Sequence, residues 1–266
     1  MKCAVWGSPI EHSLSPVLHR AAYAALGLED WTYERREVDV GGFAAALDGL
    51  DGSWRGLSLT MPLKEAALAA AIDAGEQARR TDAANTLVRD GLQGWTAHNT
   101  DVQGMVESLR ESGLEHVESI LVVGSGATAR SALAAAERLG ARRVVFMVRA
   151  RPRPETLRHA DAAGLEVAVT PMGTWVAADV IVSTVPPESL SGLTGLGDSP
   201  ATVLDVVYGS GATALQQAAR ERGWTVVAGT ELLLHQAAEQ VRLMTGHPAP
   251  VGAMRRALAD ALAARR

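Results

Sequence analysis

The stretch Ser119-Ile-Leu-Val-Val-Gly124-Ser-Gly126-Ala-Thr-Ala129-Arg130 has the pattern of a strand, a tight turn and a helix start. Its apolar run suits a buried parallel strand, and the Ala-rich continuation favours a helix. Gly124 permits the turn, Gly126 lets a pyrophosphate approach the backbone, and Ala129 allows close packing. We therefore predict dinucleotide binding, with a plain βα turn as the alternative. The expected contacts are Gly124, Ser125, Gly126, Ala127, Thr128 and Ala129.

The residues after the next strand indicate which dinucleotide binds. In NAD sites an acidic residue about 20 positions after the turn contacts the ribose hydroxyls, whereas an Arg suits the phosphate of NADP. The strand expected over 143–148 carries no acid and is followed by Arg149-Ala-Arg151-Pro-Arg153. Guanidinium groups bind phosphate through paired hydrogen bonds. We therefore predict NADP(H), in preference to a merely solvated basic loop.

Composition restricts the class of protein. A chain of 266 residues with 47% hydrophobic content can bury one large core or two smaller ones. Its net charge of −5 lacks the basic excess of a nucleic-acid-binding protein, and no segment has the apolar length of a membrane span. Gly7 and Pro9 interrupt the first apolar run, unlike a signal peptide. We expect a cytoplasmic protein.

Cysteine and histidine usage gives two further expectations. The single cysteine, Cys3, excludes an internal disulfide, and its position in an apolar strand predicts core packing. The seven histidines form no compact metal-ligand spacing, so no metal is expected. No Tyr-x-x-x-Lys pair occurs. A metal-free dehydrogenase must then take its catalytic proton from another side chain.

Strands and helices alternate on both sides of the Gly-rich turn. The preceding residues predict a second α/β unit of about 100 residues, and the following ones a doubly wound unit of six strands. Before the turn we expect a helix reaching residue 74, a strand from Asp82, and a hairpin at Asp90-Gly91 with a partner strand over 92–97. The strand expected over 179–186 has a polar carboxyl end at Ser183-Thr184. This end, with Thr184 and Val185 as contacts, is expected to face the nicotinamide.

Two serines precede the helix expected over 17–26. Pro16 suits the start of this helix, so Ser13 and Ser15 would lie just before its N-terminus. Hydroxyls and free amides there can hold an anion such as a carboxylate. The alternative is that Ser15 only caps the helix.

Lys64 has an unusual predicted position. The segment Gly56-Leu-Ser58-Leu-Thr60-Met-Pro62-Leu-Lys64 predicts a strand that breaks at Pro62, which suits a first helical turn. A cation is disfavoured at a helix N-terminus, although exposure reduces that cost. Lys64 is therefore a candidate catalytic residue, with an exposed surface lysine as the alternative.

Polar residues gather at two further strand ends. Asn85 lies near the beginning of the strand expected from Asp82, and Asn99 and Asp101 follow another strand. For Asn99, Thr100 and Asp101 the alternative is that they only cap the helix expected over 102–112. Open parallel sheets, however, place their ligands at strand ends, so Asn85, Asn99 and Asp101 are candidate site residues.

Taken together, the sequence resembles the shikimate dehydrogenase family along nearly its whole length. Seven motifs occur in the family's order: residues 7–19, 59–64, 84–86, 99–101, the Gly124 turn, 205–208 and 229–236. The resemblance implies NADPH-dependent reduction of 3-dehydroshikimate to shikimate, in the route to chorismate and the aromatic amino acids. It also implies two α/β domains, with C-terminal helices that return to the first.

The resemblance assigns a role to each matching residue. Lys64 and Asp101 match the catalytic pair, with Asp101 also contacting substrate. Ser13 and Ser15 match the groups that bind the substrate carboxylate. The remaining substrate matches are Thr60, Asn85, Tyr208 and Gln236, and the remaining cofactor matches are Arg149, Arg153 and Gly229. The domains are expected at 1–101 plus 238–266 for substrate and 102–237 for NADP.

Some positions depart from the family pattern. Ser58 stands where the family often has Asn, Ala127 where Gly is frequent, Ser210 where Pro is frequent, and Glu231 is atypical. None of these is in the catalytic pair, so the reaction class is unaffected. Two alternatives remain: a dehydrogenase that prefers quinate or an amino-shikimate to shikimate, and an NADP-binding regulator that catalyses no reaction. The first domain could pair with a copy of itself to form a homodimer, but no sequence motif indicates the oligomeric state.

The expected mechanism uses both members of the pair. Hydride from NADPH would reach the ring carbonyl carbon while Lys64 supplies a proton to its oxygen. Asp101 would hydrogen-bond that oxygen or Lys64, which orients the groups and stabilises charge.

Overall fold

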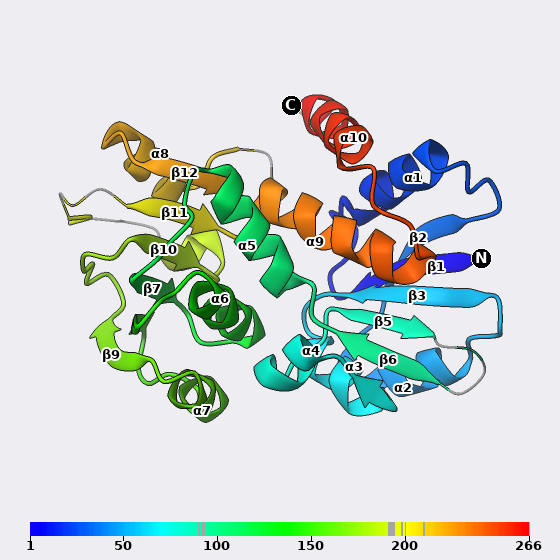
Figure 1. Ribbon diagram of the computed structural model, residues 1–266, viewed down its shortest axis with the longest axis horizontal. Helices are drawn as coiled ribbons and strands as arrows, with labels where there is room; N and C mark the ends of the chain where they lie inside the picture. Colours follow the sequence, from blue (N-terminus) through cyan, green and yellow to red (C-terminus); the bar gives the residue numbers. More distant parts are fainter. Residues whose placement is uncertain are drawn as a thin grey trace. The chain divides into compact units, whose positions relative to one another are not determined.

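The computed structural model describes residues 1–89, 91, 94–190, 195–197, 199, 201–209 and 211–265. Within this part of the chain the protein folds into two compact units (Figure 1). The first contains Met1–Thr100 and Leu233–Arg266, and the second contains Asp101–Leu232. None of the helices in the described ranges is long and apolar enough to cross a membrane.

The second unit is a doubly wound parallel sheet, as expected. Its strands lie in the order β12-β11-β10-β7-β8-β9, and each adjacent pair is parallel. From β7, the first strand of the unit, the chain adds strands first on one side of the sheet and then on the other. Such sheets bind ligands at the point where this direction changes. The strands are β7 (Ser119–Val123), β8 (Arg143–Val148), β9 (Glu166–Pro171), β10 (Val180–Ser183), β11 (Thr202–Asp205) and β12 (Thr225–Ala228). The helices are α5 (Asp101–Glu111), α6 (Ala127–Arg138), α7 (Pro154–Ala162), α8 (Ala214–Glu221) and the start of α9 (Gly229–Thr245).

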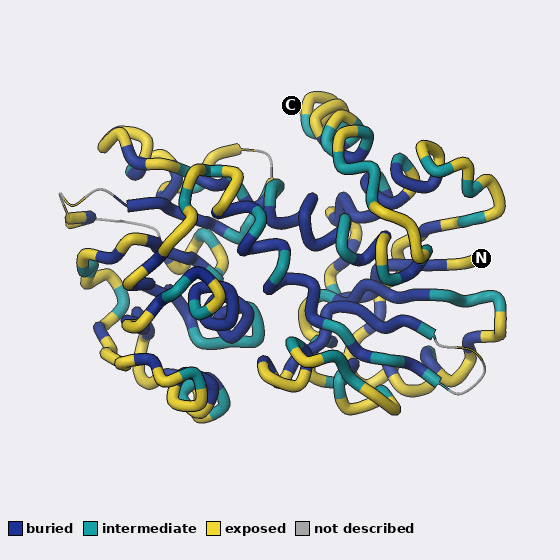
Figure 2. Tube along the Cα trace, in the orientation of Figure 1, coloured by how far each residue is buried: buried dark blue, intermediate teal, exposed yellow. Residues whose placement is uncertain are grey.

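Both faces of this sheet are covered, which explains the continuous apolar strands. Ile120 and Val122 pack in a core that includes residues of α5 and α6, whereas Leu121 and Val123 pack in another that includes residues of α8. Alternate residues of a strand point to opposite faces, so a strand buried on both sides needs no polar positions. The strand β7 is accordingly buried along its length (Figure 2).

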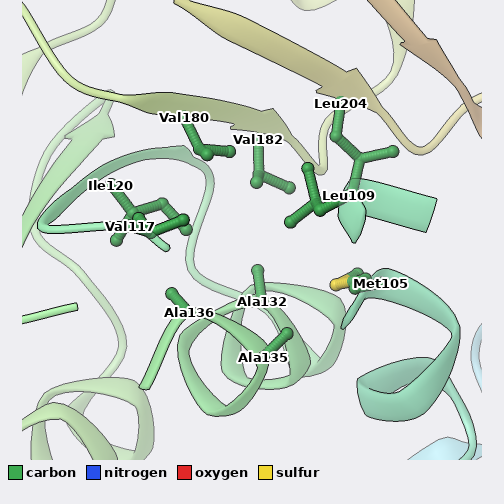
Figure 3. A pocket seen from close by; sticks show the side chains of 10 residues that line it. All are labelled: Met105, Leu109, Val117, Ile120, Ala132, Ala135, Ala136, Val180, Val182 and Leu204. Atoms are coloured by element: carbon green, nitrogen blue, oxygen red, sulfur yellow. The ribbon is translucent and has the colours of Figure 1, made fainter. Parts of the chain in front are cut away.

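The core between α5, α6 and the sheet is tightly packed. Only apolar side chains line the small gap there, which is too small to hold a water molecule (Figure 3). The lining residues are Met105, Leu109, Val117, Ile120, Ala132, Ala135, Ala136, Val180, Val182 and Leu204. Without a polar group this gap is packing and not a ligand site.

The first unit contains a mixed sheet in the order β2-β1-β3-β5-β6-β4. The pairs β1–β2, β1–β3 and β4–β6 are parallel, whereas β5 is antiparallel to both β3 and β6. The strands are β1 (Lys2–Gly7), β2 (Thr32–Glu37), β3 (Trp54–Leu59), β4 (Asp73–Ala74), β5 (Thr86–Arg89) and β6 (Trp95–His98). The helices are α1 (Ser15–Ala25), α2 (Val40–Asp48), α3 (Lys64–Ala70), α4 (Glu76–Thr81), the rest of α9, and α10 (Val251–Ala263).

This sheet is also buried on both faces. Trp6 belongs to a core with α2 and α3, whereas Cys3 belongs to the opposite core with Tyr23 of α1 and Met244 of α9. The expected core packing of Cys3 is confirmed, and burial raises the pKa of its thiol to about 11. The last helix, α10, packs beside α1 (Figure 1).

Two local predictions in this unit need correction, and one short helix was not predicted. The helix that begins at Lys64 ends at Ala70 and not near residue 74, because the backbone at 72–75 bonds to β6 instead. The short helix α4 was missed. Asp82 starts no strand but ends α4 in the left-handed conformation, with φ of 47°.

The expected hairpin is present between β5 and β6, with Gly91 at φ of 60°. Asp90 and the expected strand start at residue 92 lie outside the described residues, as does Ser210.

Candidate functional site

Four strand ends meet at one edge of the first unit's sheet. The strands β1, β3 and β6 run in the same direction and end there, while antiparallel β5 begins there. Asn85 directly precedes β5, and its backbone bonds both neighbours: its carbonyl accepts from Leu59 N at 2.7 Å, and its amide donates to His98 O at 3.1 Å. Candidate site residues that are distant in sequence therefore lie at the ends of adjacent strands.

The two serines lie before and at the start of α1, but their geometry differs from the capping interpretation. The helix begins at Ser15, its N-cap residue is Leu14, and no side chain caps it. Ser13 Oγ instead accepts a hydrogen bond from Ser15 N at 3.3 Å. Pro16 has no N–H, and Val17 N already donates to Leu14 O. The amides of Ser15 and Val17 are therefore already bonded within this turn, and the buried hydroxyls of Ser13 and Ser15 are its candidate anion-binding groups.

Lys64 is fixed at the beginning of α3, as expected, although Pro62 lies before the helix. Thr60 N donates to Trp6 O at 2.9 Å, and Leu63 N donates to Thr60 O at 2.8 Å, which closes a turn between β3 and α3. A Cβ on Gly7 would lie 2.3 Å from the Thr60 methyl carbon, so only glycine allows this close approach of β1. The turn places Thr60 and half-buried Lys64 at the same sheet edge.

Asn85 and Gln236 are brought together across 151 positions of sequence. Asn85 Nδ2 donates to Gln236 Oε1 at 3.3 Å and to Thr100 Oγ1 at 3.0 Å. Asn85 Oδ1 accepts from Thr100 N at 2.8 Å. Gln236 Nε2 donates to Leu233 O at 2.8 Å. Both amides are buried, so their polar atoms require such partners.

Asn99 and Asp101 have different surroundings. Asn99 Nδ2 donates to Thr81 Oγ1 at 2.8 Å, which ties the end of β6 to the end of α4. Asp101 is buried and is the first residue of α5 in the second unit. Asn99 thus makes a contact that stabilises the fold. Asp101 stays a candidate catalytic residue.

The glycines of the dinucleotide motif serve different purposes. Gly124 has φ of 107°, and a Cβ there would lie 2.5 Å from Thr184 Oγ1. Gly126 has φ of −86° and is the N-cap of α6 without any side-chain cap, and its added Cβ would meet nothing within 4 Å. Packing therefore requires glycine at 124 but not at 126. The open space beside Gly126, at a helix N-terminus, fits a phosphate-binding turn.

The arginine segment is attached to the Gly-rich turn. Arg153 N donates to Ser125 Oγ at 3.2 Å, and Thr156 Oγ1 donates to Ser125 O at 2.7 Å. Arg149 directly follows β8, the neighbour of β7, and both Arg149 and Arg153 are exposed. The backbone that carries Arg153 is thus held next to the expected pyrophosphate turn.

The remaining expected cofactor residues, and the expected substrate residue Tyr208, follow the carboxyl ends of β10, β11 and β12. Thr184 Oγ1 donates to Val123 O at 2.8 Å, so Thr184 and the next residue, Val185, are anchored beside β7. Tyr208 lies in the segment after β11. A Cβ on Gly229 would lie 2.6 Å from Val206 O, so the start of α9 needs glycine.

Buried Asp205 at the end of β11 supports that segment. Its carboxylate accepts from Thr213 Oγ1 at 2.6 Å, and burial raises its pKa above the usual range.

Sequence reasoning missed several polar residues next to Asn85. The most notable is Gln240, which is 1% exposed and contacts Asn85, Thr86, Ser58 and His19. The available signal was its position: it lies one helical turn after Gln236, so both amides share a face of α9.

These features define a two-unit α/β protein with a Rossmann-type dinucleotide unit and a separate polar site unit. Comparison with known families gives a more specific result. Residues 5–87 match the model of the shikimate dehydrogenase substrate binding domain, and residues 229–259 match the shikimate 5'-dehydrogenase C-terminal domain.

Individual relatives cover nearly the full chain. The shikimate dehydrogenase (NADP(+)) of Moorella thermoacetica is 34% identical, over 98% of this chain and 93% of its own. The crystal structure of Mycobacterium tuberculosis shikimate dehydrogenase is 39% identical, with a TM-score of 0.89 over 97% of this chain and 99% of its own. A Thermus thermophilus shikimate 5-dehydrogenase in complex with NADP(H) and shikimate is 28% identical, with a TM-score of 0.84 over 98% and 100% of the two chains. The chain therefore belongs to the shikimate dehydrogenase family.

Proposed function

We propose that this protein is an NADP-dependent oxidoreductase that reversibly reduces 3-dehydroshikimate to shikimate, in the pathway to chorismate and the aromatic amino acids. The observation that carries the proposal is the nearly full-length match to enzymes named shikimate dehydrogenase (NADP(+)). The buried amide pair of Asn85 and Gln236 supports it, because a polyhydroxylated ring requires buried hydrogen-bonding groups.

In this proposal the first unit binds the substrate. Ser13 and Ser15 bind its carboxylate through their hydroxyls, and Thr60, Asn85 and Gln236 bind the ring hydroxyls. A ligand that pairs with these groups is favoured over one that leaves them unpaired, since an unpaired buried polar group costs about 1–3 kcal/mol. Tyr208 is also proposed as a substrate contact. The domain bounds proposed from the family resemblance are 1–101 plus 238–266 for substrate and 102–237 for NADP, and they differ slightly from the bounds of the two units.

The second unit fits NADP(H). Residues 124–129 would hold the pyrophosphate, Arg149 and Arg153 the additional phosphate, and Thr184, Val185 and Gly229 the nicotinamide end. The open space at Gly126 and the attachment of the arginine segment to Ser125 support this fit. When bound, NADPH supplies the hydride that reduces the ring carbonyl.

Lys64 is the proposed proton donor to the carbonyl oxygen of the substrate. Its fixed place at the start of α3 restricts the directions from which its ammonium group can approach. Asp101 would hydrogen-bond the same oxygen or Lys64 itself. A positioned acid of this kind contributes roughly 100-fold to 10,000-fold in rate.

A two-by-two assay tests the proposal. Purified protein is given shikimate or quinate with NADP or NAD, and reduced nicotinamide is followed by absorbance. We expect strong turnover only with shikimate and NADP. Preference for quinate would indicate a related dehydrogenase, and absence of turnover in all four mixtures, with NADP binding retained, would indicate a regulator. An amino-shikimate is tested in the same way.

Two further expectations accompany the function. We propose a cytoplasmic location, which cell fractionation tests. A homodimer is also a proposal, and light scattering of the purified protein measures its mass directly.

A further inference from the structure

A chain of buried polar side chains runs through the first unit behind Asn85. It comprises His19 of α1, Tyr33 of β2, Ser58 of β3 and Gln240 of α9, all of them at most 3% exposed. Tyr33 Oη donates to Ser58 Oγ at 2.6 Å, and Ser58 Oγ donates to Gln240 Oε1 at 2.8 Å. The His19 ring stacks on Tyr33 at 3.9 Å between centroids. We call these four residues the Gln240 network.

The Gln240 amide uses its full hydrogen-bonding capacity. Its Oε1 accepts from Ser58 Oγ and lies 3.2 Å from His19 Nε2, while its Nε2 donates to Thr86 Oγ1 at 3.0 Å and to Asn85 O at 3.4 Å. An amide oxygen has two lone pairs and an amide nitrogen has two hydrogens. A flipped amide would place Oε1 against the Asn85 carbonyl oxygen, which has no hydrogen to donate, so only one orientation satisfies all four contacts.

This orientation passes to Asn85 through Thr86. Because Thr86 Oγ1 accepts from Gln240, its own hydrogen is available for Asn85 Oδ1, which lies 2.9 Å away. Thr100 donates to Asn85 Oδ1 as well, through its backbone N at 2.8 Å and through Oγ1 at 3.2 Å. Donors from Thr86 and Thr100 thus hold the oxygen side of the Asn85 amide, while Nδ2 donates to Thr100 Oγ1 and to Gln236 Oε1.

We propose that Gln240 is a positioning residue for substrate binding: supported by Tyr33, Ser58 and His19, it sets the direction of the Asn85 amide so that Nδ2 is presented as a donor to a ring oxygen of the substrate. This inference rests on the proposed function, in which Asn85 binds the ring. Gln240 itself acts through Thr86 and Asn85.

The decisive variant is Gln240→Glu, because it changes donors without changing shape. An ionised carboxylate has no N–H to give Thr86, so the Thr86 hydroxyl turns away from Asn85. We expect the KM for shikimate to rise about tenfold, as for one lost buried hydrogen bond, with the KM for NADP unchanged. Burial raises the pKa of such a carboxyl, so protonation at lower pH restores a donor. The ratio of variant to wild-type KM should then fall between about pH 9 and about pH 6.

Two more variants separate positioning from general destabilisation. Tyr33→Phe removes the far donor of the network, and we expect a rise of about twofold to threefold in the shikimate KM. Val241→Ala is the matched control: Val241 neighbours Gln240 on α9 and is fully buried, but its side chain is apolar. It should lower the melting temperature and leave the shikimate KM unchanged.

The outcomes distinguish the two proposals. Shikimate turnover by the wild type, together with an unchanged KM in Gln240→Glu at every pH, overturns the positioning role alone. A KM rise that is equal in Val241→Ala, or independent of pH in Gln240→Glu, overturns it as well. Lack of wild-type turnover with shikimate refutes the proposed function before any variant is compared.

Discussion

Lys64 illustrates how far a single residue can be interpreted from its position. Sequence pattern placed it at the end of a strand and the start of a helix, and the structure confirms that α3 begins there. Pro62 was expected in the first turn of this helix, but it lies in the turn that precedes α3. The catalytic role of Lys64 stays a prediction that a substitution can test.

We expect Lys64→Ala to lower kcat by about 100-fold or more, because a positioned general acid contributes at least that factor. NADPH affinity, measured by fluorescence titration, should be nearly unchanged, since Lys64 belongs to the other unit. Turnover equal to that of the wild type would exclude the role. Glu65→Ala, at the next residue of the same helix, serves as the control and should retain activity.

Arg149 carries the prediction on cofactor choice. Arg149→Ala should weaken NADPH binding about tenfold and leave NADH binding nearly unchanged, because only NADPH offers the extra phosphate. Calorimetric titration with both cofactors measures this. Parallel losses for both would remove the phosphate assignment. Arg143→Ala, at the exposed start of the same strand, is the matched control.

The turn between β7 and α6 allows packing and ligand binding to be separated. Gly126→Ala introduces a methyl group into open space at an ordinary φ, so its melting temperature should be close to that of the wild type. If that space accommodates pyrophosphate, NADP(H) affinity should fall by about tenfold or more, because the methyl blocks close approach. Unchanged NADP(H) affinity in the Gly126→Ala variant would place the pyrophosphate elsewhere.

Gly124→Ala gives the opposite pattern and serves as the comparison. Its positive φ and the 2.5 Å approach to Thr184 Oγ1 would strain the second unit. We expect a destabilisation of roughly 1–3 kcal/mol. A thermal melt distinguishes the two variants.

The reversal of β5 is what assembles the candidate substrate residues. In a wholly parallel sheet, Asn85 at the beginning of its strand would lie at the opposite edge from Thr60 at the end of β3. Because β5 is antiparallel to β3, its beginning lies beside the end of β3. The Asp90-Gly91 pair predicted the hairpin. That the antiparallel direction of β5 places Asn85 beside Thr60 became clear only from the structure.

Buried His19 links the first unit's stability to pH. Burial lowers the pKa of its imidazole to about 3, from 6.5. The folded state therefore keeps His19 neutral while the unfolded chain takes up a proton below about pH 6.5. The rings of Tyr23 and Tyr33 pack against this imidazole. His19 thus contributes stability above its unfolded pKa, and this contribution is lost as pH falls towards about 3.

We expect the free energy of unfolding to decrease by up to about 1.4 kcal/mol per pH unit through that window from His19 alone. Denaturant titrations at a series of pH values measure the slope. His19→Phe retains an aromatic ring against Tyr33 and should show a shallower slope. An identical slope in the variant would mean that other groups cause the acid sensitivity.

The sequence by itself determined most of the fold and the family. The β7 turn, the six parallel strands and the spaced motifs are local patterns, and the doubly wound sheet, the Gly124 turn and the family membership are confirmed. Local boundaries failed where tertiary bonds decided them: β4 exists because its backbone pairs with β6, and Ser15 cannot cap α1 because the helix already begins at that residue.

Only the tertiary structure revealed the Gln240 network and the contact between Asn85 and Gln236. Their members come from α1, β2, β3, α9 and the residue that precedes β5, and an amide carries no local signal of the partner it will meet. Hydrogen-bond direction depends on every neighbour of a buried group at once, so it is fixed by the packed fold and cannot be inferred from spacing along the chain.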